Sequence, residues 1–220
     1  MFAFVPGEVV ELQLAPGVGG TEAVIGAVLE VVPNPILIVA TNPVDIMTGV
    51  VATLSGLPVR KVIGSGTILD TARFRTLIGE HLSIAPQSVH AYVLGEHGDS
   101  EVLAWSSVKI GGVPLYDFAE QSERPIDEET KLIIDTKVRR AAYLIIEGKG
   151  ATHFGVGGGI ARIARAIDKD EGVVLTLSNP DSPLGDLQGV SLSLPRVLGA
   201  EGIRRTITPS LNKDENESLH

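Results

Sequence analysis

The amino-acid sequence predicts an α/β fold in which part of a parallel sheet is followed by a mixed α+β domain. Three observations support this prediction. Two short apolar runs, 36–40 and 61–64, are rich in β-branched residues and do not alternate with polar ones, as in strands covered on both faces. Helical patterns flank both runs. Three short strand candidates, 173–177, 190–194 and 203–207, follow the longest helical pattern.

The first part of the chain alternates helical and strand patterns. Residues 1–20 indicate a short strand or irregular segment rich in turn residues. Apolar residues at helical spacing predict a helix over 21–32, with Thr21 as its cap. A second helix is predicted over 44–55, ending at Gly56. A helix between two buried strands is typical of neighbouring parallel strands in a sheet.

The rest of the chain predicts helices and strands in mixed order. Asn212, with Glu215 three residues later, has the pattern of a capped helix start. The chain stops before that helix acquires an apolar face, so we expect a truncation there. The other elements predicted are helices over 67–82, 127–147 and about 152–167, and strands over 89–94 and 102–110.

Composition narrows the classes of function. The chain has 220 residues, 44% of them hydrophobic, which is enough for a packed core. A net charge of −9 disfavours nucleic-acid binding, and the absence of cysteine excludes disulfides and thiolate zinc sites. No apolar run reaches the roughly 18 residues of a membrane span, and the N-terminus lacks the pattern of a signal peptide. A cytosolic protein is the simplest interpretation.

A single histidine stands in a tight loop at 94–102, LGEHGDSEV. The flanking glycines indicate a turn that presents the imidazole of His97, whose ordinary pKa suits proton transfer near neutral pH. A structural turn histidine is the alternative on residue type alone. The five histidines show no ligand spacing, so we predict no metal site.

Two charged residues share one helix face in 64–75, GSGTILDTARFR. Asp70 and Arg73 lie three apart, and in isolation they would be an ordinary surface ion pair. Because their neighbours are mostly apolar, the segment is half buried, and each charge then needs a partner. A histidine suits the carboxylate, and a substrate carboxylate suits the guanidinium.

Two further stretches are informative only together with these. Asn42 in TNPVD (41–45) follows a buried strand, where open α/β sheets bind ligands, although a turn residue is the alternative. The glycine-rich stretch 149–163 permits close backbone approach but is no GxGxxG after a strand. The stretch 15–22, APGVGGTE, fails as such a motif because Glu22 takes the third glycine position.

In order and spacing, the four segments TNPVDIMT, GSGTILDTARFR, YVLGEHGDSEV and EGKGATHFGVG resemble the L-lactate dehydrogenases of the lactate/malate dehydrogenase family. The resemblance covers roughly residues 23–212. The second and third segments have the residue pattern of the lactate enzymes rather than that of the malate enzymes. It implies a remnant of a Rossmann-type parallel sheet at 23–66 and a mixed α+β substrate domain at 67–220, after an unplaced segment at 1–22.

The resemblance also implies roles. His97 corresponds to the general acid–base, Asp70 to the carboxylate that orients it, and Arg73 to the fork that grips the substrate carboxylate. Asn42 and Thr152 correspond to substrate-binding residues. The implied contacts of the NAD cofactor near its nicotinamide end are Ala40, Thr41, Asn42, Ser65 and Val156.

Activators and partners are implied in the same way. Arg75 and His90 match positions that in many bacterial members bind fructose 1,6-bisphosphate at a subunit interface, although they are equally ordinary surface cations. The implied substrate is a small 2-hydroxy or 2-oxo acid, with no nucleic-acid or membrane partner. The implied assembly is a homotetramer.

The sequence departs from the family in two places. It lacks the GxGxxG turn and ribose-binding acid of the family's first half, and it lacks the loop arginine before TNPVD, since Arg60 is its first basic residue. Three interpretations therefore stand: a truncated lactate dehydrogenase, a non-catalytic substrate-domain fragment, and a malate dehydrogenase. A sheet cut in this way would expose an apolar edge and face, which predicts aggregation or obligate assembly.

Overall fold

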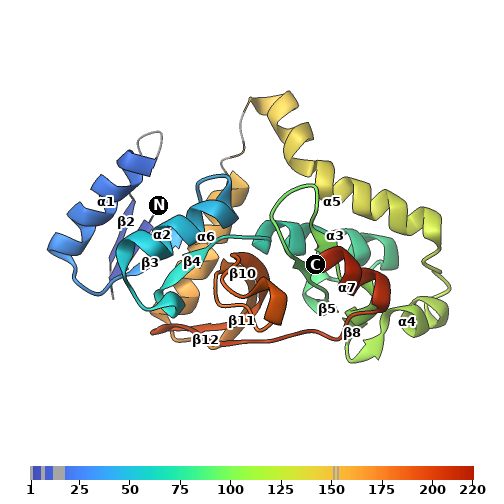
Figure 1. Ribbon diagram of the computed structural model, residues 1–220. Coiled ribbons are helices and arrows are strands. Elements are labelled where there is room, and N and C mark those ends of the chain that lie inside the picture. Colours follow the sequence, from blue (N-terminus) through green and yellow to red (C-terminus); the bar gives the residue numbers. More distant parts are fainter. Residues whose placement is uncertain (1, 6–7, 12–17, 151, 153) are drawn as a thin grey trace.

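A computed structural model describes residues 2–5, 8–11, 18–150, 152 and 154–220. Its centre is a mixed sheet with the strand order β12-β11-β10-β4-β3-β1-β2 (Figure 1). β3 and β4 are parallel, as predicted, and the other pairings in this sheet are antiparallel. The strands are β1 (Phe2–Val5), β2 (Glu8–Glu11), β3 (Ile36–Val39), β4 (Val62–Gly64), β10 (Val173–Asn179), β11 (Leu192–Gly199) and β12 (Gly202–Thr206).

Helices cover both faces of this sheet, which explains the unalternating apolar runs. In β3, Ile36 and Ile38 pack with residues of α6 (Phe154–Asp168). Leu37 and Val39 face the other way, toward α1 (Val18–Val31) and α2 (Val44–Ser55). A strand buried on both faces has no polar side, so the α/β prediction is confirmed.

A second core lies beside the sheet, around α3 (Ile68–Leu82) and α5 (Glu128–Lys149). Phe74 is fully buried at its centre and meets Trp105 edge to face, with ring centroids 4.7 Å apart. Figure 1 shows this part at the opposite end of the molecule from α1. Its smaller elements are β5 (Val89–His90), β6 (Val93–Leu94), β7 (Val102–Leu103), β8 (Lys109–Ile110), β9 (Val113–Pro114) and α4 (Leu115–Gln121).

Some predicted boundaries were wrong. The runs at 89–94 and 102–110 each form two short strands, and the second is interrupted by the 3₁₀ turn at Trp105–Ser107. The helix α4 was not predicted. β1 pairs antiparallel with β3 and so covers the edge that was expected to be open. Whether 66/67 separates two domains stays a prediction.

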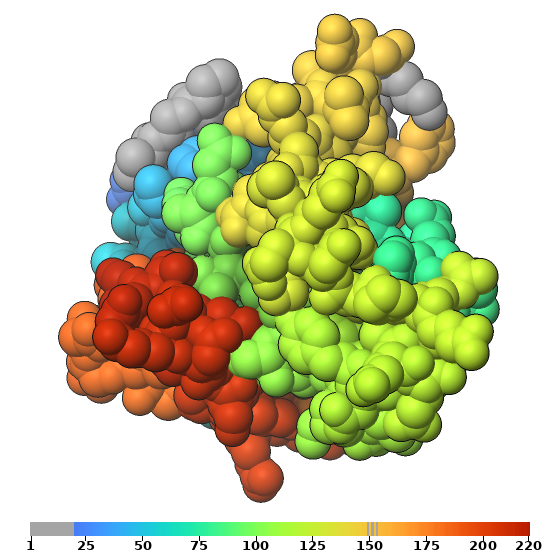
Figure 2. All heavy atoms as spheres, turned by 90° about the vertical axis from the view of Figure 1, so that its right-hand side faces the viewer, coloured from blue at the N-terminus to red at the C-terminus, as the bar shows by residue number. Residues whose placement is uncertain are grey.

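The C-terminal helix α7 (Lys213–Leu219) begins where the sequence predicted, with Asn212 and Glu215 forming a capping box. The Glu215 carboxylate also accepts a hydrogen bond from the backbone N–H of Ser106 at 2.9 Å and one from its hydroxyl. Figure 2 shows these C-terminal residues, in red, seated beside residues from the middle of the chain, in green.

A tight β-turn between β11 and β12 depends on one glycine. Gly202 has φ +93, and a Cβ there would overlap the backbone carbonyl oxygen of Arg60. We expect Gly202→Ala to lower the free energy of unfolding by more than about 1–2 kcal/mol, because backbone strain and a clash with rigid backbone combine. Gly189→Ala is the control, since Gly189 has φ +84 but open space. Equal losses in urea denaturation would show that the clash contributes nothing.

Candidate active site

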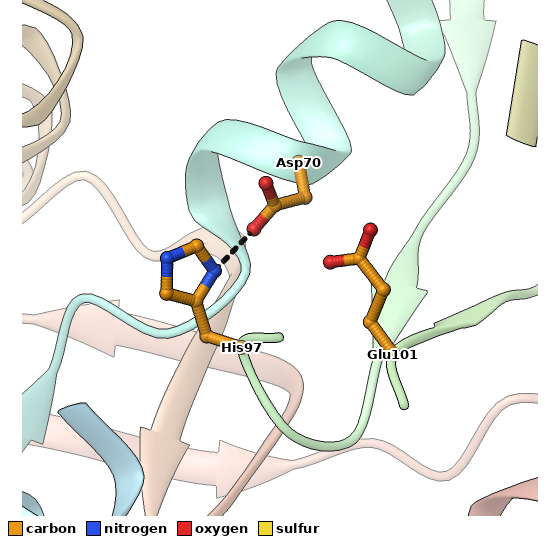
Figure 3. A group of neighbouring side chains, drawn as sticks. All are labelled: Asp70, His97 and Glu101. Carbon is orange, nitrogen blue, oxygen red and sulfur yellow. Dashed lines mark hydrogen bonds and ion pairs between the residues drawn. The ribbon is translucent and has the colours of Figure 1, made fainter. Parts of the chain in front are cut away.

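The loop between β6 and β7 presents His97, and two buried carboxylates hold it. The Asp45 carboxylate, at the start of α2, accepts the backbone N–H of His97 at 2.8 Å. The Asp70 carboxylate, in the first turn of α3, lies 2.7 Å from Nδ1 of the ring (Figure 3). Both the loop and the imidazole are therefore fixed, and Nε2 is the nitrogen left for chemistry.

Asp70 is 3% exposed and binds two cationic or ionisable groups with its two oxygens. Oδ2 contacts His97, and Oδ1 accepts a hydrogen bond from Arg73 Nη1 at 2.8 Å. In the described part of the chain, the other guanidinium N–H groups of Arg73 have no protein acceptor. A planar cation with unused parallel donors can bind a carboxylate in bidentate fashion.

The side chains of Arg73 and His97 both line one cavity of about 480 Å³. Its walls come from the sheet edge, the His97 loop, and the end of α5 with the start of α6, so residues far apart in the sequence meet there. Apolar side chains such as Leu69 and Ile145 form much of its surface. The predicted site residues that line it are Ala40, Asn42, Ser65, Arg73, His97, Thr152 and Val156. Thr41 is not among the lining residues.

The cavity opens at the carboxyl ends of the parallel pair. Ala40 follows β3 and Ser65 follows β4, and the Ser65 N–H donates to Val39 O at 2.8 Å. Gly66 continues this turn with φ +49, where a Cβ would meet the Ser193 hydroxyl and the backbone of β10. A glycine is needed at this position because no side chain fits. Ligands of open α/β sheets bind at this edge.

Electrostatics favour a protonated histidine. The hydrogen bond that His97 Nδ1–H donates to Asp70, together with the nearby charges of Asp70, Glu101 and Asp45, raises the pKa of His97 above 6.5, although burial acts against it. Burial also raises the pKa of Asp45 above its usual range. An imidazolium can donate a proton to a substrate oxygen near neutral pH.

Sequence reasoning missed Asp45 and Glu101. Asp45 lies within TNPVD, where no role is predicted for it, and its contact with His97 spans a sequence separation that no local pattern reveals. Glu101 is 3% exposed, and burial together with the charge of Asp70 raises its pKa to about 8. The charged residue in the otherwise apolar run after the loop was its only signal.

Two other arrangements fit the site less well. Ligand atoms of Asp70, His97 and Glu101 lie within 4.8 Å of one another, close enough to share a metal ion. However, Arg73 and His97 already occupy both oxygens of Asp70, as a hydrogen-bonded network requires.

A larger cavity of about 690 Å³ beside α2 is lined by Asp45 and Glu96, so its charge opposes an acidic ligand.

The two positions matched to an activator lie apart from this site. The Arg75 Nε donates to Ala91 O at 2.8 Å, and its guanidinium lies 5.1 Å from the centre of the Tyr92 ring. It lines a cavity of about 290 Å³, whereas His90 lines another of about 440 Å³ with Lys109. Within one protomer, the two residues therefore line different cavities.

Comparisons with known proteins agree with one another. The model of the lactate/malate dehydrogenase alpha/beta C-terminal domain matches residues 67–220. The L-lactate dehydrogenase of Thermus aquaticus is 55% identical over 196 residues, which are 89% of this chain and 63% of that protein. Those of Allorhizobium ampelinum and Bacillus caldolyticus are 53% and 50% identical, over 89% and 84% of this chain and 63% and 58% of theirs. The chain thus spans somewhat less than two thirds of these relatives' length.

Proposed function

The chain belongs to the lactate/malate dehydrogenase family, and on this premise we propose that its site performs the L-lactate dehydrogenase reaction, the NAD-dependent interconversion of (S)-lactate and pyruvate. The observation that carries the proposal is the convergence of His97, Asp70 and Arg73 at one cavity. A 2-oxo acid has a carboxylate beside a carbonyl. The site offers a fixed cation beside a protonated imidazole.

The roles follow from this geometry. Arg73 binds the substrate carboxylate and so places the C2 oxygen toward His97. His97 donates the proton of Nε2 to that oxygen during reduction and takes it back during oxidation. Asp70 holds Nδ1 in its protonated form and stabilises the imidazolium, so the ring keeps one orientation throughout. Asn42 and Thr152 complete the polar wall of the cavity.

The cavity suits the nicotinamide end of the cofactor. NADH supplies the hydride when it is bound. Ala40, Ser65 and Val156 line the cavity at the edge where β3 and β4 end, and the apolar side chains of Ile68 and Leu69 exclude water from a ring placed there. Thr41 and Asn42 lie in the same turn. The described residues provide a site for this part of the cofactor, and the sequence has no GxGxxG motif for the phosphates.

One feature favours a non-catalytic role as the alternative. Arg73 is the single lysine or arginine among the described residues that line the cavity, so His97 alone would polarise the substrate carbonyl. A chain of this kind binds the acid and the nicotinamide but turns them over slowly or not at all. A malate dehydrogenase activity is the third possibility, with oxaloacetate as its substrate.

The decisive experiment is NADH oxidation by the 220-residue chain with pyruvate, followed by absorbance. We expect turnover that falls by about 10²–10⁴-fold in His97→Asn, because general acid catalysis is worth that much. His81→Asn is the matched control, since the His81 ring contacts the Pro125 carbonyl away from the cavity. NADH binding without turnover would instead support the non-catalytic role, and faster turnover of oxaloacetate the malate role.

Two finer proposals rest on the resemblance. Fructose 1,6-bisphosphate would bridge Arg75 and His90 across a subunit interface, and the assay with and without it tests this.

Exposed apolar side chains on α5, such as Leu132 and Leu144, support assembly into a homotetramer, which sedimentation measures. No helix in the described part of the chain is long and apolar enough to span a membrane. We propose a cytosolic location.

A further inference from the structure

Glu101 is a buried acid that the reaction described above does not use. It is the last residue of the His97 loop, and its N–H donates to Gly98 O at 3.2 Å. The side chain points toward Asp70 and His97 (Figure 3). Among the described residues, its carboxyl group has no hydrogen-bond partner, and its Oε1 is fully buried. A buried ionised carboxylate without a partner is strongly disfavoured.

The charges around Glu101 decide where the proton resides. Asp70, on α3, already has both oxygens bonded, one to Arg73 and one to His97, whereas Glu101 has no such partner among the described residues. Two close carboxylates in a buried site do not both ionise easily, so the acid without partners keeps its proton.

The other charged groups facing Glu101 lie on two elements. His97 comes from the loop, and Arg139 and Asp135 come from α5. Arg139 is bound to Asp135, with Nε 2.5 Å from the carboxylate, and donates to Asp99 O at 2.8 Å. Its charge is therefore largely neutralised locally and is not available to pair with Glu101.

We propose that Glu101 is a positioning residue for the acid–base pair: it is a neutral carboxylic acid at neutral pH, and its ionisation in alkaline solution holds the proton on His97 more tightly. This inference rests on the proposed function, because it assigns a task to the acid behind His97. Glu101 touches neither substrate nor cofactor in this role and acts only through the imidazole.

The sign of the effect follows from charge. When Glu101 ionises, its negative charge stabilises the imidazolium, so the pKa of His97 rises as the pH passes about 8. The two groups therefore titrate together, and the loss of the His97 proton is spread over a wider pH range than that of a single group. The proton donor would then persist into alkaline solution.

The same coupling affects stability. The pKa of Glu101 rises from 4.5 to about 8 on folding, so the folded chain binds a proton that the unfolded chain has released. The contribution of Glu101 to stability is therefore fully present below about pH 4.5 and is lost as the pH rises through about 8. His97, whose pKa is also raised, adds a loss that begins above its unfolded value of 6.5.

The test is a nuclear magnetic resonance titration of the whole 220-residue chain, carried out without substrate or cofactor. In chain labelled with ¹³C at the glutamate carboxyl, we expect one resonance with a midpoint near pH 8, absent from Glu101→Gln. In histidine-labelled chain, the His97 signal should titrate broadly. In Glu101→Gln it should follow a single-group curve with a midpoint about one pH unit lower.

Glu96→Gln is the matched control, because Glu96 lies on the same loop but is exposed. An equal shift of the His97 midpoint in both variants would reduce the effect to general charge and overturn the proposal. If all glutamate carboxyls of the unsubstituted chain titrate in their ordinary range, Glu101 is ionised and the proposal fails, even if the variant does not fold. Because neither measurement needs turnover, a chain that titrates as expected but does not oxidise NADH would contradict the proposed function alone.

Discussion

In the reaction proposed above, replacing Asp70 with asparagine is expected to lower the rate of pyruvate reduction by about 10²–10⁴-fold. An amide of the same size can still accept a hydrogen bond from Arg73, so we expect α3 to keep its packing. It cannot, however, both accept the Nδ1–H hydrogen bond and supply the negative charge that stabilises an imidazolium. The ring would then favour the wrong tautomer, and the pKa of His97 would fall because the main cause of its raised value, the hydrogen bond to the Asp70 carboxylate, is removed.

Two measurements check this expectation. Steady-state kinetics give kcat and KM for pyruvate, and the loss should appear mainly in kcat because Arg73 still binds the carboxylate. A histidine titration gives the pKa of His97 without turnover, and it should be lower in Asp70→Asn. Asp99→Asn is the control, since Asp99 is exposed on the same loop and contacts neither residue. An unchanged His97 titration in Asp70→Asn would remove Asp70 from the role given to it.

The parallel core of the fold was predictable because burial on both faces leaves a direct mark on the sequence. Alternate residues of β3 pack against α6, and the residues between them pack against α1 and α2. Each position of the strand must therefore be apolar. The antiparallel strands were harder to delimit. A strand was expected over 190–194, yet β11 begins at Leu192 and continues to Gly199.

The site residues that belong to recognisable sequence motifs were predictable. Those that act through contacts between distant parts of the sequence were less so. Asp70, Arg73 and His97 belong to motifs that the sequence shows together, and they meet as expected. Asp45 and Glu101 act on His97 by position alone, since an acid beside a loop looks the same in sequence whether it is solvated or buried. Local patterns report helical or strand periodicity, but they do not report which distant side chain fills the last buried position.

Replacing Arg196 with methionine is expected to lower the free energy of unfolding by about 3–5 kcal/mol. Arg196 is fully buried, and its pKa falls to about 10 because of burial, so it is charged at neutral pH. Methionine matches much of its volume and removes a desolvated charge, which offsets part of the loss. The guanidinium donates to the carbonyl groups of Leu177, Asn179, Asp181 and Leu192 and to the hydroxyl of Thr206.

The loss should exceed that offset because several buried acceptors lose their donor at once, each at about 1–3 kcal/mol before the structure relaxes. Urea denaturation followed by circular dichroism measures it. The control is Arg205→Met, which removes an exposed arginine from β12, the neighbouring strand, and should change stability by no more than about 0.5 kcal/mol. Equal stabilities of the two variants would mean that the carbonyl groups find other donors.

The loss of Arg196 should also affect the candidate active site, because β11 contacts both the His97 loop and the segment just before Asp70. Gly95, two residues before His97, exchanges backbone hydrogen bonds with Ser193 at 2.8 and 3.0 Å. The Ser193 hydroxyl accepts the N–H of Thr67, just before α3 and Asp70, at 3.1 Å. A β11 loosened by the loss of Arg196 would let the His97 loop and α3 move independently. We therefore expect Arg196→Met to lower the pKa of His97 at urea concentrations where the chain is still folded, whereas Arg205→Met should leave it unchanged.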